Sequence, residues 1–194
     1  MTIAIAKDEA FNFTYRANID ALKTLGKVVF FSPLRDATLP ECDLLYLPGG
    51  YPELFADELS ANLSMRQSIK EYAECDGHIF AECGGFMYLT RSIDGTPMCG
   101  VLPLEATMNN ARLHLGYRTM ECNGIILRGH EFHYSEIEEK ELPGGLTAEH
   151  SQLSAKGTPV STAIYRYRNV VAGYTHWYWG EDLRILQAFH LITL

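Results

Sequence analysis

The sequence lacks the patterns that assign a chain to several common classes of protein. Its five cysteines form no Cys-x-x-Cys pair and no even framework: Cys42, Cys75, Cys83, Cys99 and Cys122. This spacing argues against a disulfide scaffold, and we expect reduced thiols in a cytoplasmic protein. No apolar run approaches the roughly 20 residues that a membrane-spanning helix needs. The first ten residues include Lys7, Asp8 and Glu9, which is unlike a secretory signal.

Positive charge and nucleotide-binding motifs are also missing. The 16 lysine and arginine residues are outnumbered by 24 aspartate and glutamate residues, giving a formal net charge of −8. This balance argues against nucleic acid or an anionic membrane as the main partner. The Gly26-Lys27 pair lacks the glycine and the Ser or Thr of a phosphate-binding loop, and no Gly-x-Gly-x-x-Gly follows a strand. No nucleotide site is therefore predicted.

What is present is the composition of one globular domain of 194 residues, with 47% hydrophobic and 21% charged residues. Its first half alternates apolar runs with segments of helical spacing. Strands are predicted at 2–6, 27–31, 43–47 and 77–80, and helices at 18–25 and 64–75. Fully apolar strands that alternate with helices indicate a parallel sheet that is covered on both faces.

The second half has shorter and more polar strand patterns, which favour an antiparallel extension of the α/β fold. These strands are predicted at 113–120, 124–128, 131–134 and 162–166. Exposed loops are expected at 143–145 and 151–161, where turn-forming residues accumulate. A buried strand at 170–175 and a helix at 182–194 complete the prediction.

The segment Ala81-Glu82-Cys83-Gly84-Gly85 is the most informative part of the sequence, because it joins a predicted strand to a predicted helix that begins near Phe86. A cysteine at such a turn, followed by glycines, is typical of a nucleophile elbow. The start of a helix favours the thiolate, so we expect a lowered pKa for Cys83. The alternative is a buried structural cysteine beside a turn.

The loop Pro48–Glu53 follows the third predicted strand. Ligands of parallel sheets bind beyond the carboxyl ends of the strands, so we expect this loop to face Cys83. Gly49 and Gly50 allow backbone N–H groups to converge, and together with the N–H of Gly84 they can hold a tetrahedral oxyanion. An ordinary Pro-Gly turn is the alternative.

His176 follows the buried run 170–175, at the same predicted edge of the sheet as Cys83, which suits a cysteine–histidine pair. His130 and His133 lie three residues apart in a probable strand, whereas a His-Glu-x-x-His zinc site needs a spacing of four on a helix. Strand alternation puts Glu131 and His133 on the face opposite to His130. We therefore predict no metal site, and expect a polar strand that faces a ligand or a partner domain.

Together, five blocks of the sequence resemble the glutaminase domain of cobyrinic acid a,c-diamide synthases, which belong to the class I glutamine amidotransferases. The blocks are 48–53, 81–85, 116–118, 129–135 and 174–176. The resemblance covers nearly the whole chain. It implies the three-layer, flavodoxin-like fold of that class, with a mainly parallel sheet, helices on both faces and an antiparallel extension.

The resemblance also implies roles. Cys83 matches the nucleophile that attacks the side-chain amide of L-glutamine, and His176 matches the general base. Backbone at Gly50 and Gly84 would form the oxyanion hole. The matched blocks contain further residues expected at a substrate or interdomain surface: Tyr51, Glu53, Tyr117, Arg118, His130, Glu131 and His133. In such enzymes the ammonia passes to an ATP-dependent synthetase domain, which amidates the a and c carboxylates of a corrinoid.

Two departures from the family pattern leave alternatives open. Class I enzymes usually have an acid two residues after the histidine, but here that residue is Tyr178, and Glu181 or Asp182 are possible substitutes. The ATP-binding domain is absent from these 194 residues, so ATP and Mg²⁺ are expected only in a separate or excised part, and no cofactor in this chain. The alternatives are a non-catalytic binding or regulatory module, a stand-alone cysteine hydrolase, or a glutaminase for cobyric acid or nickel-sirohydrochlorin amidation.

Overall fold

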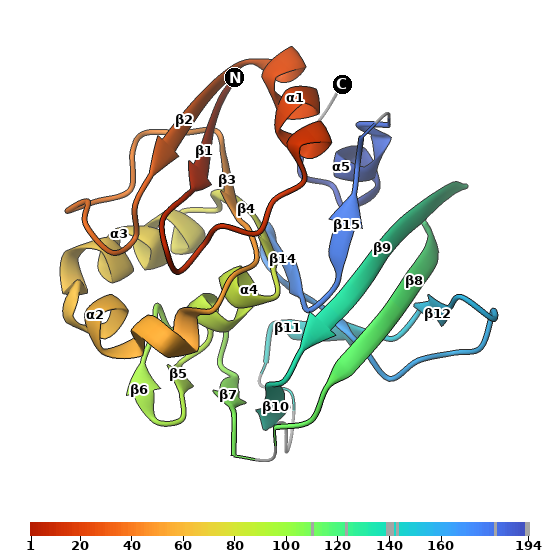
Figure 1. Cartoon of the computed structure of the whole chain (residues 1–194). Helices are drawn as coiled ribbons and strands as arrows, with labels where there is room; N and C mark the ends of the chain where they lie inside the picture. The colour runs from red at the N-terminus through yellow and green to blue at the C-terminus, as the bar shows by residue number, and fades with distance from the viewer. Residues whose placement is uncertain (110, 123, 139–141, 143, 181, 193–194) are drawn as a thin grey trace.

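A seven-stranded sheet forms the centre of the computed structural model, which describes residues 1–109, 111–122, 124–138, 142, 144–180 and 182–192 (Figure 1). Five neighbouring strands are parallel: β2 (Lys27–Phe31), β1 (Thr2–Ala6), β3 (Leu44–Leu47), β4 (His78–Glu82) and β14 (Val170–Gly173). Next to β14, the antiparallel strands β13 (Ile164–Tyr167) and β11 (Leu146–Glu149) extend the sheet. The predicted parallel sheet is confirmed.

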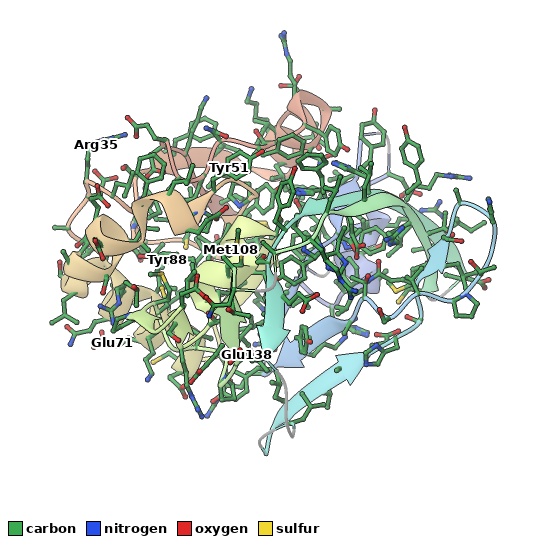
Figure 2. The ribbon with its side chains drawn as sticks, turned by 60° about the horizontal axis from the view of Figure 1, so that its bottom comes forward. Arg35, Tyr51, Glu71, Tyr88, Met108 and Glu138 are labelled. Carbon is green, nitrogen blue, oxygen red and sulfur yellow. The ribbon has the colours of Figure 1, made fainter. Side chains whose placement is uncertain are left out.

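Helices cover both faces of this sheet. Ala4 and Leu45 pack on the side of α3 (Leu63–Glu74) and α4 (Gly84–Leu89), while Ile3 and Leu44 face α1 (Arg16–Leu25) and α5 (Arg184–Ala188). The short helices η1 (Pro52–Phe55) and α2 (Ala56–Ala61) precede α3. Figure 2 shows charged side chains such as Arg35 and Glu71 at the periphery, whereas Tyr88 of α4 is buried. The three-layer arrangement agrees with the predicted fold class.

Two smaller sheets account for the predicted antiparallel extension. One has the order β12 (Leu153–Ser154), β8 (His114–Cys122), β9 (Ile125–His133) and β15 (His176–Tyr178). The other has the order β10 (Glu136–Glu138), β7 (Glu105–Thr107), β5 (Ser92–Ile93) and β6 (Thr96–Pro97). The longest described helix, α3, has 12 residues, and none of the described helices is long and apolar enough to cross a membrane.

The prediction of two strands at 124–128 and 131–134 is wrong, because β9 continues through Gly129 without a break. A Cβ atom at Gly129 would lie 2.4 Å from the backbone oxygen of His176 on the neighbouring strand β15. The glycine therefore permits a close approach between two strands and does not end one.

The C-terminal boundaries also differ from prediction. Strand β14 ends at Gly173, and His176 begins the separate strand β15. The predicted helix at 182–194 is limited to α5, and residues 193–194 lie outside the described part. His190 adopts φ 58°, and Leu191 N–H donates to Leu186 O at 2.8 Å. This is a helix-ending Schellman geometry, which usually has a glycine at the position of His190.

The segment 151–161, predicted as an exposed loop, contains β12 and the fully buried Gln152. Gln152 accepts a hydrogen bond from the Thr175 hydroxyl at 2.7 Å, which ties this segment to the chain just before β15. In the other predicted loop, Gly144 and Gly145 form a turn, and Pro143 lies outside the described residues.

Candidate active site

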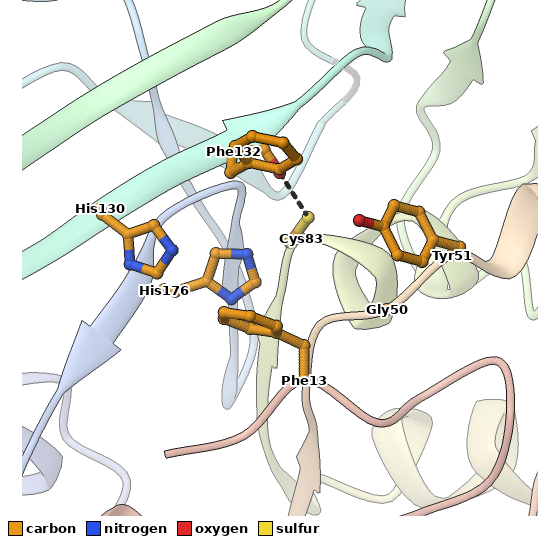
Figure 3. Close-up of a pocket in the computed structure, with 7 residues that line it drawn as sticks. All are labelled: Phe13, Gly50, Tyr51, Cys83, His130, Phe132 and His176. Atoms are coloured by element: carbon orange, nitrogen blue, oxygen red, sulfur yellow. Dashed lines mark hydrogen bonds between the residues drawn. The ribbon is translucent and has the colours of Figure 1, made fainter.

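A cavity of about 300 Å³ opens at the carboxyl edge of the parallel strands (Figure 3). Its lining comes from segments far apart in the sequence: Phe13, Gly50, Tyr51, Cys83, His130, Phe132 and His176. The two residues predicted to act as nucleophile and base therefore line the same cavity. A ligand-sized, largely apolar hollow with a few polar groups at this edge is what an α/β sheet offers a small molecule.

Cys83 occupies a sharp turn between β4 and α4. Its φ of 47° lies in the left-handed region, which is rare for a residue with a side chain. The turn is held by backbone hydrogen bonds from Cys83 N–H to Gly173 O at 2.8 Å and from Met87 N–H to Cys83 O at 3.0 Å. Strained backbone of this kind accumulates at functional sites, and the turn has the geometry predicted for a nucleophile elbow.

The expected lowering of the Cys83 pKa is wrong. Burial raises the pKa of the thiol to about 12, and the nearby Glu53 carboxylate raises it further, while the Gly84 N–H acts in the opposite direction. The helix that follows has only six residues, so its dipole does not offset the loss of solvation. Cys83 is therefore a neutral thiol.

His176 is also neutral. Burial lowers its pKa to about 3, and His130 and His133 act in the same direction. The imidazole lies between two rings: Phe13 meets it edge-on with centroids 4.7 Å apart, and His130 stacks on it at 4.9 Å. A buried neutral imidazole beside a thiol is able to accept a proton.

None of the expected acids in the described part of the chain bonds to His176, whose Nδ1 atom is buried without a hydrogen-bond partner there. Tyr178 is 48% exposed and its ring contacts Tyr15. Asp182 instead forms an ion pair with Arg184. Glu181, the other possible substitute, lies outside the described residues.

The predicted glycine loop lies against the elbow. A Cβ atom at Gly84 would fall 2.9 Å from Gly50 N, so the backbones of the two residues are adjacent. Tyr51 N–H and Gly85 N–H donate to loop carbonyls, but Gly50 N–H donates to none among the described residues. Gly49, by contrast, lies against the His176 ring, because a Cβ atom at Gly49 would lie 2.2 Å from Cε1 of His176.

Sequence reasoning missed Phe13, Tyr15 and Phe132 as residues of this site. Phe132 O lies 3.9 Å from the Cys83 sulfur, and the Tyr15 hydroxyl lies 2.7 Å from Nδ1 of His130. Phe13 and Tyr15 follow the carboxyl end of β1, so the rule that placed the Gly50 loop at this edge also applies to them. No residue-specific motif marks either one.

The remaining predicted residues do not line this cavity. His133 and Glu131 project from the other face of β9, as alternation predicted: His133 lines a second cavity of about 270 Å³, and buried Glu131 pairs with Arg118. Tyr117 is exposed on β8 opposite His130. Glu53 is half-buried in η1, and burial raises its pKa. No group of three potential metal ligands occurs among the described residues.

Comparison with known proteins assigns the family. Residues 2–183 match the family model of the CobB/CobQ-like glutamine amidotransferase domain. The chain belongs to this family. It is 49% identical over 144 residues to the cobyrinate a,c-diamide synthase of Methanocaldococcus jannaschii, and this alignment covers 70% of this chain and 32% of that protein. The synthase of Fusobacterium nucleatum is 43% identical over 187 residues, covering 90% of this chain and 40% of that protein.

A third relative, the cobyrinate a,c-diamide synthase of Picrophilus torridus, is 41% identical over 200 residues, covering 96% of this chain and 42% of that protein. The chain thus spans less than half the length of these relatives. Among solved structures, a glutamine amidotransferase matches with a TM-score of 0.63 and 21% identity over 96% of both chains. One from Thermotoga maritima matches with a TM-score of 0.59 and 14% identity, over 90% of this chain and 75% of that one. These likenesses establish a shared fold.

Proposed function

We propose that this chain hydrolyses the side-chain amide of L-glutamine through a Cys83 thioester and supplies the ammonia to the amidation of cobyrinic acid at its a and c carboxylates. One observation carries the proposal: a cysteine in a strained elbow and a neutral buried histidine line one cavity at the carboxyl edge of the sheet. Family membership and the names of the relatives support the choice of glutamine and corrinoid.

In the first step, the Cys83 sulfur attacks the amide carbon of glutamine while its proton passes to His176. A neutral imidazole can take up the thiol proton as the sulfur attacks, so the step needs no preformed thiolate. The carbonyl oxygen becomes an oxyanion, whose charge the N–H groups of the adjacent Gly50 and Gly84 backbones are proposed to stabilise.

The tetrahedral intermediate then collapses. The C–N bond breaks, the His176 imidazolium gives its proton to the leaving nitrogen, and ammonia departs, leaving a glutamyl thioester on Cys83. A water molecule attacks the thioester carbonyl and gives a proton to His176, which returns it to the sulfur as glutamate leaves. The cycle consumes one water and restores both residues.

The ammonia acceptor is proposed to lie on an ATP-dependent synthetase part, which would hold ATP, Mg²⁺ and the corrinoid. Leu115 and Tyr117 of β8 are 62% and 73% exposed, and they lie opposite Phe132 and His130 of the cavity wall. This apolar surface, Leu115–Tyr117 with Phe132, borders the cavity and suits docking of that part. The five free cysteines are consistent with the cytoplasm as the location.

The test compares two alkylating reagents, with the modified cysteine identified by mass spectrometry. A glutamine-like chloroketone should modify Cys83 first, because only a reagent held in the cavity meets both the sulfur and His176. Iodoacetamide, which has no such affinity, should modify exposed Cys75 first, since Cys83 is buried with a raised pKa. Chloroketone labelling of Cys42 or Cys122 ahead of Cys83 would refute the assignment and favour a non-catalytic member of the family.

A further inference from the structure

We propose that Glu82 and Asn18 are positioning residues for His176: by binding the backbone of β15, they do the orienting work that a ring-bound acid does in a triad. This inference rests on the proposed function and adds to it. Nδ1 of His176 has no hydrogen-bond partner among the described residues. An imidazole that is not bonded to an acid must be oriented by its backbone and its neighbours.

Strand β15 has one free edge. It lies at the end of its four-stranded sheet, and its other edge pairs with β9. The N–H and C=O of Trp177 and the N–H of Trp179 bond to side chains and not to β9. At such an edge a strand normally meets water or another chain. Here side chains occupy that edge, so β15 is held from both sides.

Asn18 of α1 makes two of the three bonds to this edge. Its amide nitrogen donates to Trp177 O at 2.8 Å, and its amide oxygen accepts from Trp179 N–H at 2.8 Å. The side chain thereby pairs with β15 as a neighbouring strand would. Asn18 is fully buried, so a solvent contact cannot replace these bonds.

Glu82 makes the third bond, and its position in the chain gives that bond its importance. Its Oε1 atom accepts from Trp177 N–H at 2.9 Å, and its Oε2 atom accepts from the Tyr46 hydroxyl at 2.8 Å. Glu82 precedes Cys83, and Trp177 follows His176. A single side chain therefore connects the backbone that carries the nucleophile to the backbone that carries the base.

A role in fold stability alone is a poor explanation of this carboxyl group. Glu82 is 2% exposed and forms no ion pair within the described part of the chain, and burial raises its pKa to about 8. The desolvation cost of burying a polar group largely offsets its hydrogen bonds, so such a group commonly adds little net stability. A buried carboxyl group with little net effect on stability is better explained by the geometry it imposes on the backbone next to His176.

The experiment measures inactivation of the intact chain by the glutamine-like chloroketone, separating the limiting rate kinact from the binding constant KI. Glu82→Met keeps the volume and removes the acceptor, and should lower kinact by about 10²-fold, since small misplacements of reacting groups have effects of that size. KI should change by less than about threefold, because the side chain lies outside the cavity. Glu82→Gln keeps an acceptor for Trp177 N–H and should restore kinact to within about fivefold of wild type.

Asn18→Ala and Asn62→Ala form the matched pair. Both remove a side chain that bonds to backbone, but Asn62 caps α3 and bonds to Pro33 O and Asp36 O, away from the cavity. Asn18→Ala should lower kinact, whereas Asn62→Ala should lower only the melting temperature. Equal loss of kinact in both variants, or wild-type kinact in folded Glu82→Met, would overturn the proposal.

Hydrogen exchange of the Trp177 amide separates this proposal from the proposed function. The amide should exchange faster in Glu82→Met than in wild type and stay protected in Glu82→Gln, whether or not the chloroketone reacts. If the chloroketone does not modify the wild type but Trp177 exchanges as predicted in the two variants, the proposed glutaminase function is refuted. The bond from Glu82 to the backbone of β15 is then still supported. If wild type reacts but exchange is unchanged in Glu82→Met, the positioning role is refuted. Should Glu82→Met not fold, Asn18→Ala with exchange at Trp179 decides the question.

Discussion

The imidazole of His176 rests on the backbone of Gly49, so closely that a Cβ atom on Gly49 would lie 2.2 Å from Cε1 of the ring. The same Cβ would lie 3.0 Å from Nδ1. The role of Gly49 in the oxyanion hole stays a prediction, and in the structure its lack of a side chain leaves space for the base. Phe13 and His130 enclose the ring from other directions, so any added atom at Gly49 must displace it.

Gly49→Ala should therefore slow chloroketone labelling of Cys83 by about 10²-fold or more, because His176 must leave its position. Gly144→Ala is the control, since a Cβ atom there meets open space. Circular dichroism and melting temperature report whether each variant is folded. Wild-type labelling in Gly49→Ala would show that the ring is free to move without loss of function.

His176→Ala should reduce glutaminase activity by roughly 10²- to 10⁴-fold, the usual effect of losing a general base. Tyr178→Phe should have an effect below about threefold, because the Tyr178 side chain is half-exposed and a phenol cannot serve as an anionic partner. Ammonia release is the measurement for both. An equal loss in the two variants would contradict this interpretation of Tyr178, and near-normal activity of His176→Ala would indicate another base.

Acid should destabilise the fold partly through His176. Its pKa is about 3 in the folded protein and about 6.5 when unfolded, so the unfolded chain binds protons first as the pH falls. The stabilising contribution of the neutral ring is present above about pH 6.5 and is lost toward pH 3, by at most about 1.4 kcal/mol per pH unit. Urea midpoints should therefore fall less steeply with acid in His176→Gln than in wild type. Parallel slopes would exclude the contribution.

The chain alone should hydrolyse glutamine slowly and form no amide from ATP, glutamine and the corrin acid. Adding the remaining synthetase part of a relative, in trans or by fusion, should raise ammonia release and restore amidation. We expect this because the sequence contains the nucleophile elbow, the glycine loop and His176, but no phosphate-binding motif. Robust ATP-dependent amidation by the 194 residues alone would contradict this expectation.

Leu115→Glu should weaken the response to that synthetase part while leaving chloroketone labelling of the isolated chain unchanged. Leu115 is 62% exposed on the apolar surface that borders the cavity. Ile126→Glu is the matched control, because Ile126 is similarly exposed but lies toward the opposite end of β9, opposite Glu121 of β8. Equal effects of the two variants would exclude this surface as the docking site.

Local patterns predicted the central sheet and the positions of Cys83 and Gly50. Buried parallel strands are apolar throughout, and the position of a residue relative to its strand determines the edge at which it lies. These features depend on neighbours in the sequence, so a short stretch reveals them. The resemblance to the family added roles for residues that the pattern had already located.

Long-range contacts produced the errors. The pKa of the Cys83 thiol depends on burial against β9 and on the nearby charge of Glu53, and these outweigh the short helix that the sequence predicts. Gly129 was interpreted as a break between two strands, because its neighbour in the sheet, β15, lies about fifty residues later in the chain. No local sequence pattern predicts the hydrogen bonds of Asn18 and Glu82, because their partners lie far away in the sequence.

The bond between Glu82 and Trp177 spans 95 residues of sequence, and this separation bears on how the protein folds. The nucleophile directly follows β4, whose neighbour β14 and the following β15 come from the last quarter of the chain. During synthesis, the cysteine leaves the ribosome long before the strand that brings its base. Parallel pairing of distant segments is slow to form, so a growing chain lacks the complete site until the final strands are added. Under the proposed function, a chain that ends before β15 should therefore lack glutaminase activity.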